Sequence, residues 1–144
     1  MGETQLDLLG RLLERLDHYA KTVTRASLET DLDTWLMVSR AMELAAQCCV
    51  DLALELVAAR HLGLPQSYRD AFSRLAQAGI LTPQHAAALQ GWAGLRNVLA
   101  HFYTAVDLDL LHAALLEDHG PLREFGSIAA RELGRSDDDS NERG

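Results

Sequence analysis

The sequence predicts an all-α, up-and-down helical bundle of five to six helices. Apolar residues recur every three or four positions through most of the 144 residues, which is the period of an amphipathic helix. No stretch alternates apolar and polar residues between turn signals, so no sheet is expected. Glycine, proline and N-cap residues divide the helical pattern into separate segments, as in a bundle.

The first two predicted helices differ in how much apolar surface they carry. Apolar residues follow helical spacing on one face from Leu6 to Val23. The next helix is expected to begin at the N-cap Thr30, with Asp33 three residues later as in an acidic capping box. It continues without a breaker to His61, about 30 residues, and is apolar over a wide arc. We therefore expect it to be central and packed on more than one side.

A short third helix is bounded by clear start and stop signals. Gly63 and Pro65 end the long helix that precedes it. Ser67 is a favourable N-cap, and Gly79 follows the expected last residue, Ala78. The sequence thus predicts a helix of about three turns at this point.

Three further helices complete the predicted bundle. Thr82 followed by Pro83 combines an N-cap with proline at the first helical position. Gly120 and Pro121 are expected to interrupt the later helical pattern. The expected ranges are 83–103, 107–116 and 122–133. We assign residues 1–134 to one helical domain and residues 135–144 to a disordered acidic tail that contains three consecutive aspartates.

The charge balance limits the classes of partner. The chain has 13 basic and 21 acidic residues, a net charge of −8, which excludes a uniformly basic nucleic-acid binder. Residues 1–134 alone contain 11 basic and 17 acidic residues, so the tail is not the only acidic part. Twelve of the 13 basic residues are arginine, whose fork of donors suits phosphate. Any nucleic acid must therefore be held by a local positive cleft.

Cysteine usage and hydropathy point to a soluble, cytoplasmic protein. Cys48 and Cys49 are neighbours in an apolar helical segment, so we expect buried reduced thiols. The N-terminus lacks the basic and apolar regions of a signal peptide. No run approaches the ~18 apolar residues of a membrane span, so no membrane partner is expected.

Metal and cofactor sites are not predicted. The histidines are scattered without zinc or di-iron spacing, and no glycine-rich phosphate loop or nucleophile motif is present. We expect all of them except His101 to lie at the surface or to pack with their polar atoms satisfied. The protein is therefore expected to work without a metal or cofactor.

One polar segment stands out in the otherwise apolar helix that follows Pro83. Arg96, Asn97, His101 and Tyr103 fall within eight residues and, at ~100° per residue, share one broad face. Such a face can simply be solvated, with the arginine snorkelling. It also has a cation to hold phosphate, an imidazole to move a proton and an amide to orient either one. These groups suffice for metal-independent cleavage through a ribose 2′-hydroxyl if a two-fold dimer supplies the second histidine.

The string Arg96-Asn97-x-x-x-His101-x-Tyr103 resembles the R-N-x-x-x-H-x-Y signature of the HepT toxins, a branch of the HEPN superfamily. The resemblance extends over most of the chain. Gln47 and Asp51 stand where the family often has Gln and Asp, whereas Trp92 replaces an expected Met. Further matching segments are 68–72 with Leu75, 79–81, 93–97 and Val106-Asp107.

The resemblance implies a HEPN-like homodimer that acts as a metal-independent endoribonuclease toxin on RNA. It assigns phosphate binding to Arg96, general acid or base action to His101 and an orienting role to Asn97. It also implies a cognate MntA-like nucleotidyltransferase antitoxin that neutralises the toxin by adenylylation of Tyr103. Two alternatives stay open at this point. One is a non-catalytic nucleotide- or partner-binding module, and the other is a structural bundle in which Arg96 and His101 satisfy one another.

Overall fold

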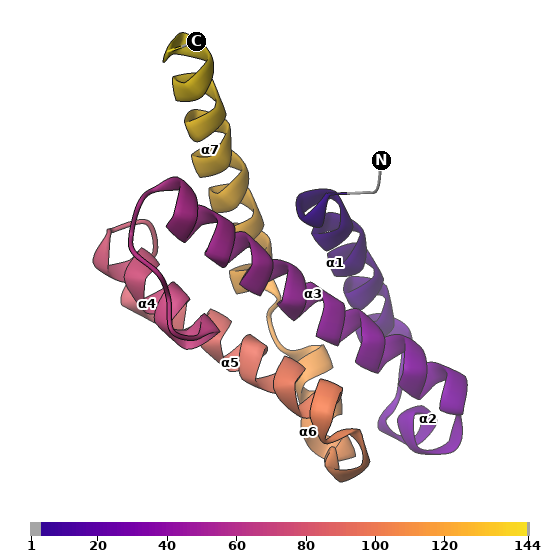
Figure 1. Ribbon diagram of the computed structural model, residues 1–144. Helices are drawn as coiled ribbons and strands as arrows, with labels where there is room; N and C mark the ends of the chain where they lie inside the picture. The colour runs from indigo at the N-terminus through magenta and orange to yellow at the C-terminus, as the bar shows by residue number, and fades with distance from the viewer. Residues whose placement is uncertain (1–3, 144) are drawn as a thin grey trace.

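The computed structural model describes residues 4–143, with side chains for residues 4–134. Over this part, the chain forms seven α-helices, one 3-10 turn and no strand (Figure 1). The all-α prediction is confirmed, with one helix more than expected. The elements are α1 (Gln5–Thr22), α2 (Arg25–Thr30), α3 (Leu32–Ala59), α4 (Tyr68–Gln77), α5 (Pro83–His101), η1 (Tyr103–Ala105), α6 (Leu108–Leu116) and α7 (Gly120–Arg143).

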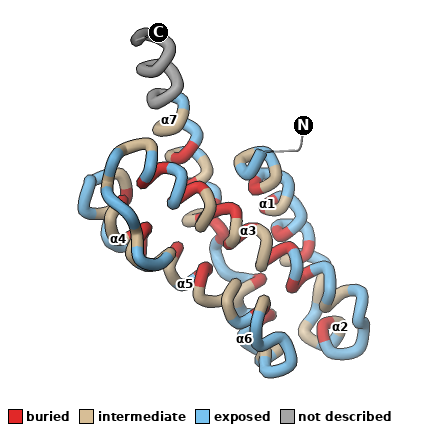
Figure 2. The backbone as a smooth tube through the Cα atoms, in the orientation of Figure 1, coloured by how far each residue is buried: buried red, intermediate tan, exposed pale blue. Residues whose placement is uncertain are grey.

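Helix α3 is the centre of the bundle. It contacts each of the other six helices, and α1, α5 and α7 are its main long neighbours (Figure 1). Its buried residues run along its length, as the red segments in Figure 2 show, and include Val38, Ala45, Leu52 and Val57. The predicted central position of the second long helix is therefore confirmed.

Most predicted helix ends agree with the observed caps. The Ser67 side chain accepts a hydrogen bond from the backbone N–H of Asp70 at the start of α4. Thr82 accepts one from the N–H of His85 at the start of α5, where Pro83 is the first helical residue. These bonds satisfy N–H groups that have no partner within the first turn of a helix.

The start of the second predicted helix is wrong. Thr24 caps the short helix α2 in a reciprocal capping box with Ser27, and Thr30 is the last residue of that helix. The N-cap of α3 is Asp31, one residue later than the predicted Thr30, because the Asp31 side chain accepts a hydrogen bond from the N–H of Asp33. Two N-caps, Thr24 and Asp31, thus start two helices in a segment where the sequence predicts a single helix start.

The predicted break at Gly120 and Pro121 is also displaced. Helix α7 begins at Gly120, so both residues lie in its first turn, where proline needs no N–H partner. The chain leaves helical geometry between α6 and α7 at residues 117–119. Helix α7 continues to Arg143, so the predicted helix end at residue 133 is wrong. The acidic tail assigned to residues 135–144 lies outside the described side chains, and its disorder stays a prediction.

Both cysteines are buried in α3, as predicted. Burial raises the pKa of the Cys49 thiol far above its usual range, which keeps this thiol protonated. In the part of the chain that the structure describes, no helix has the length and hydropathy to span a bilayer.

Candidate active site at the end of α5

Helix α5 holds its first two motif residues beside its buried side chains. Leu89, Ala93 and Leu99 are among the side chains that it buries, and it packs against α3 and α4. Arg96 and Asn97 are half-buried, and Val98 is exposed. The buried leucines therefore fix the helix, and the helix sets the direction of the polar side chains.

Arg96 and Asn97 form a direct pair. The Arg96 Nη1 donates a hydrogen bond of 2.8 Å to the Asn97 Oδ1. Within residues 4–134, no carboxylate forms an ion pair with Arg96. The guanidinium is thus oriented by a neutral partner and keeps its full charge and further N–H donors for an anion.

The four motif residues do not all lie on one helix, because Tyr103 falls outside α5. Helix α5 ends at His101, and Phe102 takes φ −128° and ψ 38° with its N–H bonded to the Val98 carbonyl. Tyr103 starts the 3-10 turn η1, so the prediction that this helix continues to Tyr103, with Tyr103 on the helical face of Arg96, is wrong. His101 and Tyr103 are both exposed. No described hydrogen bond joins Arg96 to His101, which argues against the structural reading in which they satisfy one another.

Gln47 and Asp51, the other polar positions singled out from the sequence, lie one turn apart on α3. The Gln47 Nε2 donates to the Asp51 Oδ1 at 2.7 Å, and both residues are half-buried. Helix α3 packs on α5, the helix that carries the motif. Gln47 and Asp51 therefore hold each other's side chains in place by a hydrogen bond, as Arg96 and Asn97 do.

A hollow of about 410 Å³ lies beside Tyr103. It runs between the α2–α3 junction and the segment from η1 to the start of α6. The sequence indicates Trp35 only as one of the apolar residues of α3, because its place in the lining of this hollow depends on the tertiary fold. The lining residues are Leu28, Glu29, Thr30, Leu32, Trp35, Tyr103, Thr104 and Leu108.

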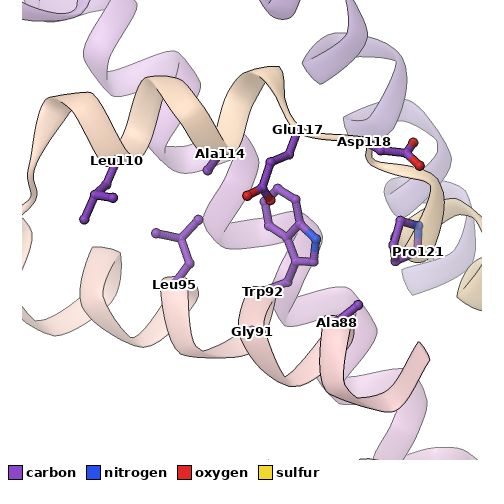
Figure 3. A pocket seen from close by; sticks show the side chains of 9 residues that line it. All are labelled: Ala88, Gly91, Trp92, Leu95, Leu110, Ala114, Glu117, Asp118 and Pro121. Atoms are coloured by element: carbon purple, nitrogen blue, oxygen red, sulfur yellow. The ribbon is translucent and has the colours of Figure 1, made fainter. Parts of the chain in front are cut away.

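A second groove, of about 570 Å³, lies between α5 and α6 (Figure 3). Leu95 from α5 and Leu110 from α6 form its apolar walls, and Trp92 lies at its base. Glu117 and Asp118 stand at the end near α7. These two carboxylates would repel RNA phosphate, so the groove does not extend the candidate site.

The histidines outside the motif are dispersed, as predicted. One of them, His119, differs from the prediction in the hydrogen bonding of its ring. His85 Nε2 lies 2.8 Å from the Pro121 carbonyl oxygen. His119 is buried against Trp92, and its Nε2 has no hydrogen-bond partner among the residues that the structure describes, although its Nδ1 lies 3.6 Å from Asp17. The prediction of satisfied polar atoms is therefore wrong for His119, because its ring fills space beside an indole. Across the described residues, no group of three or more His, Cys, Asp or Glu could hold a metal ion.

The family is decided by a sequence profile that covers most of the chain. The profile of the HepT-like ribonucleases matches residues 9–127, from the second turn of α1 into α7. The chain belongs to the HepT-like ribonuclease family. The resemblance that the Arg96–Tyr103 segment indicates is thereby confirmed at the level of the family.

Two curated relatives of this HepT-like chain are nucleases. The mRNA nuclease HepT of Shewanella oneidensis is 34% identical over 70 residues, which span 49% of this chain and 53% of the relative. The tRNA nuclease HepT of Aphanizomenon flos-aquae is 27% identical over 113 residues, 78% of this chain and 76% of the relative. The match to the first relative thus spans about half of its length.

Solved structures share the fold. A tri-AMPylated Shewanella oneidensis HEPN toxin in complex with an MNT antitoxin superposes with a TM-score of 0.79 at 23% identity, over 88% of this chain and 94% of that one. A toxin–antitoxin complex with AMP-PNP gives 0.77 at 22% identity, over 87% and 94%. The cytosolic protein YutE of Bacillus subtilis gives 0.69 at 17% identity, over 87% of each chain. These likenesses confirm a HEPN-like fold.

Proposed function

We propose that this HepT-like chain is the toxin of a toxin–antitoxin pair and cuts RNA without a metal. The observation that carries the proposal is the Arg96 guanidinium, held by Asn97 at 2.8 Å with no carboxylate partner among the described residues, on the helix that ends at His101. A fixed cation and an imidazole on the same helix are two of the groups that phosphodiester cleavage requires, and a second imidazole completes the set. Its place of action is the cytoplasm.

The proposed chemistry uses the substrate's own nucleophile. One imidazole takes the proton of a ribose 2′-hydroxyl, and the 2′-oxygen attacks the adjacent phosphorus. The bond from phosphorus to the 5′-oxygen breaks, and a protonated imidazole donates a proton to that leaving oxygen. The products are a 2′,3′-cyclic phosphate and a free 5′-hydroxyl. Arg96 binds the phosphate and stabilises the charge that develops on its oxygens.

A homodimer supplies the second imidazole in this scheme. Val98 and Phe102 lie four residues apart on the motif segment, and 38% and 63% of their surfaces are exposed. Apolar side chains at this spacing favour an interface that brings two motifs together. Phe102→Glu is expected to give a monomer by light scattering and to abolish cleavage. A dimeric Phe102→Glu protein would exclude this interface.

Neutralisation by a nucleotidyltransferase fits the exposure of Tyr103. The phenolic hydroxyl would attack the α-phosphorus of ATP, so that an oxygen–phosphorus bond forms, pyrophosphate leaves and the phenol proton is lost. The AMP then adds negative charge and bulk close to the motif and excludes RNA phosphate. The MNT antitoxin bound to the AMPylated Shewanella toxin is a partner of the kind required.

The cleavage test compares wild-type protein with Arg96→Ala and His101→Ala on tRNA and mRNA. We expect both variants to lose about 100-fold or more in rate while they keep the wild-type circular dichroism spectrum. Equal cleavage by wild type and variants, or no cleavage by unmodified wild type, would refute the proposed ribonuclease activity. The non-catalytic binding module would then be the remaining interpretation. For Tyr103, intact mass after incubation with the antitoxin and ATP should rise by AMP units in wild type and stay unchanged in Tyr103→Phe.

A further inference from the structure

The hollow beside Tyr103 has the composition of a nucleobase site. Trp35 from α3 and Tyr103 from η1 both line it, and Leu28, Leu32 and Leu108 supply most of its remaining apolar lining. Its volume of about 410 Å³ falls within the roughly 300–1,000 Å³ of small-molecule pockets. Thr30 and Thr104 add hydroxyl groups. An apolar lining that includes two aromatic side chains and a few hydrogen-bonding groups suits an aromatic base.

Charge beside the hollow favours a neutral ring over a phosphate as the group held inside it. Glu29 is part of the lining, and its carboxylate bonds Arg25 at 3.1 Å. Arg25 also bonds Asp109 at 2.6 Å, so two carboxylates neutralise one guanidinium. The three groups carry a net negative charge, which disfavours a phosphate and leaves a neutral ring as the suitable occupant.

Tyr103 links this hollow to the proposed modification. Its side chain is 59% exposed while it lines the hollow, so a group can be attached there without unpacking the core. A nucleotide on the phenolic oxygen carries its base on a short ribose–phosphate tether. The tether gives the base a high effective concentration at the hollow, so that a modest stacking energy is enough to hold it.

We propose that the hollow binds the adenine of the AMP attached to Tyr103, with Trp35 as the stacking surface. The inference rests on the proposed adenylylation and adds the place where the modified side chain is held. Docking of the base would keep the attached phosphate in a fixed position instead of leaving it free to swing away from the motif.

Tryptophan fluorescence gives a direct test, because the chain has two tryptophans in different environments. Trp35 lines the hollow, whereas Trp92 is 7% exposed and lies at the other groove. In Trp92→Phe, emission comes from Trp35 and should fall when the full chain is AMPylated, since adenine stacking quenches indole. In Trp35→Phe, emission comes from Trp92 and should not change. Circular dichroism of each variant checks the fold.

Release of AMP gives an independent readout. A non-specific phosphodiesterase should remove AMP from modified Trp35→Ala about fivefold to tenfold faster than from wild type, because stacking is lost. Trp35→Phe keeps an aromatic face and should release AMP at close to the wild-type rate.

The possible outcomes distinguish failure of the adenine site from failure of the proposed adenylylation of Tyr103. No gain of AMP at Tyr103, by intact mass, removes the adenylylation and the inference with it. A full gain of AMP with unchanged Trp35 emission, and equal release rates in wild type and Trp35→Ala, overturns the inference alone.

Discussion

The Arg96 guanidinium donates a 2.8 Å hydrogen bond to the side-chain oxygen of Asn97, its direct neighbour in α5. Neighbouring helical positions are about 100° apart, so the amide reaches the guanidinium from the side. An amide oxygen orients the cation without neutralising it, which a carboxylate would do. We infer that Asn97 is a positioning residue for Arg96.

Asn97 substitutions should therefore separate orientation from charge. Asn97→Ala should lower kcat for RNA cleavage about tenfold, because Arg96 loses its fixed direction. Asn97→Asp should mainly raise KM, because the new carboxylate pairs with Arg96 and competes with phosphate. The control is Gln90→Ala, a substitution on the same helix as Asn97 that removes hydrogen bonds to the Arg69 carbonyl and the Ser73 hydroxyl of α4. This variant should cleave RNA at the wild-type rate. Equal kinetics for Asn97→Ala and wild type would contradict the role.

The ion pair between α3 and α7 should contribute more to stability than the pair between α1 and α7. Arg60 bonds both the Glu132 carboxylate at 2.6 Å and its backbone carbonyl at 2.9 Å, and both side chains are largely shielded. Arg60→Ala should lower the free energy of unfolding by about 1–3 kcal/mol in urea titration. Arg123→Ala, which breaks the exposed bond to Asp17, should cost less than about 1 kcal/mol. The reverse order would refute this ranking.

Two glycines with positive φ predict a graded response to alanine. Gly63 has φ +94°, and a Cβ there would lie 2.5 Å from the Arg74 Nη1, which donates to the Leu62 carbonyl. Gly79 has φ +78° with open space around it. Gly79→Ala should cost about 1–2 kcal/mol in strain, and Gly63→Ala about 1 kcal/mol more. In an Arg74→Ala background the two costs should become equal, as measured by thermal or urea unfolding.

Asp70 predicts a pH-dependent part of the stability. A hydrogen bond from the Gln66 backbone N–H, and then one from Arg74, hold the pKa of Asp70 below its usual range. A lowered pKa in the folded state stabilises the protein at pH values above the unfolded pKa, and this contribution disappears as pH falls through the folded pKa. Asp70→Asn should thus be less stable than wild type at neutral pH, and the difference should shrink below about pH 4. A difference that does not change with pH would contradict the assignment.

Helix period and cap chemistry account for how much of the fold is predictable. The apolar arc of α3 predicts its central place, and Ser67 and Thr82 mark helix starts correctly because local side chains decide those ends. Helix α2 has only six residues, too few for the spacing of its apolar residues to identify a helix. Asp31 also competes with Thr30 as the N-cap of α3. Local signals therefore fail where two of equal strength are adjacent.

The candidate site was predictable in its residues and not in its geometry. Arg96, Asn97 and His101 follow from residue type and spacing in one helix. Tyr103 is expected on the same helical face, but the backbone turns at Phe102, a residue with no sequence feature that breaks a helix. Trp35 and Tyr103 line one hollow although they are 68 positions apart in the chain, and no local sequence pattern predicts that arrangement.

The contact of α3 with every other helix has a consequence for how the molecule opens. No neighbouring helix can detach without exposing part of the same apolar surface, so partial unfolding of the bundle is penalised throughout. Amide hydrogens near Ala45 and Leu52 should exchange with solvent deuterium only through global opening, and those near Tyr103 through local fluctuation. The segment proposed for regulation can then change while the rest of the polypeptide keeps its native state.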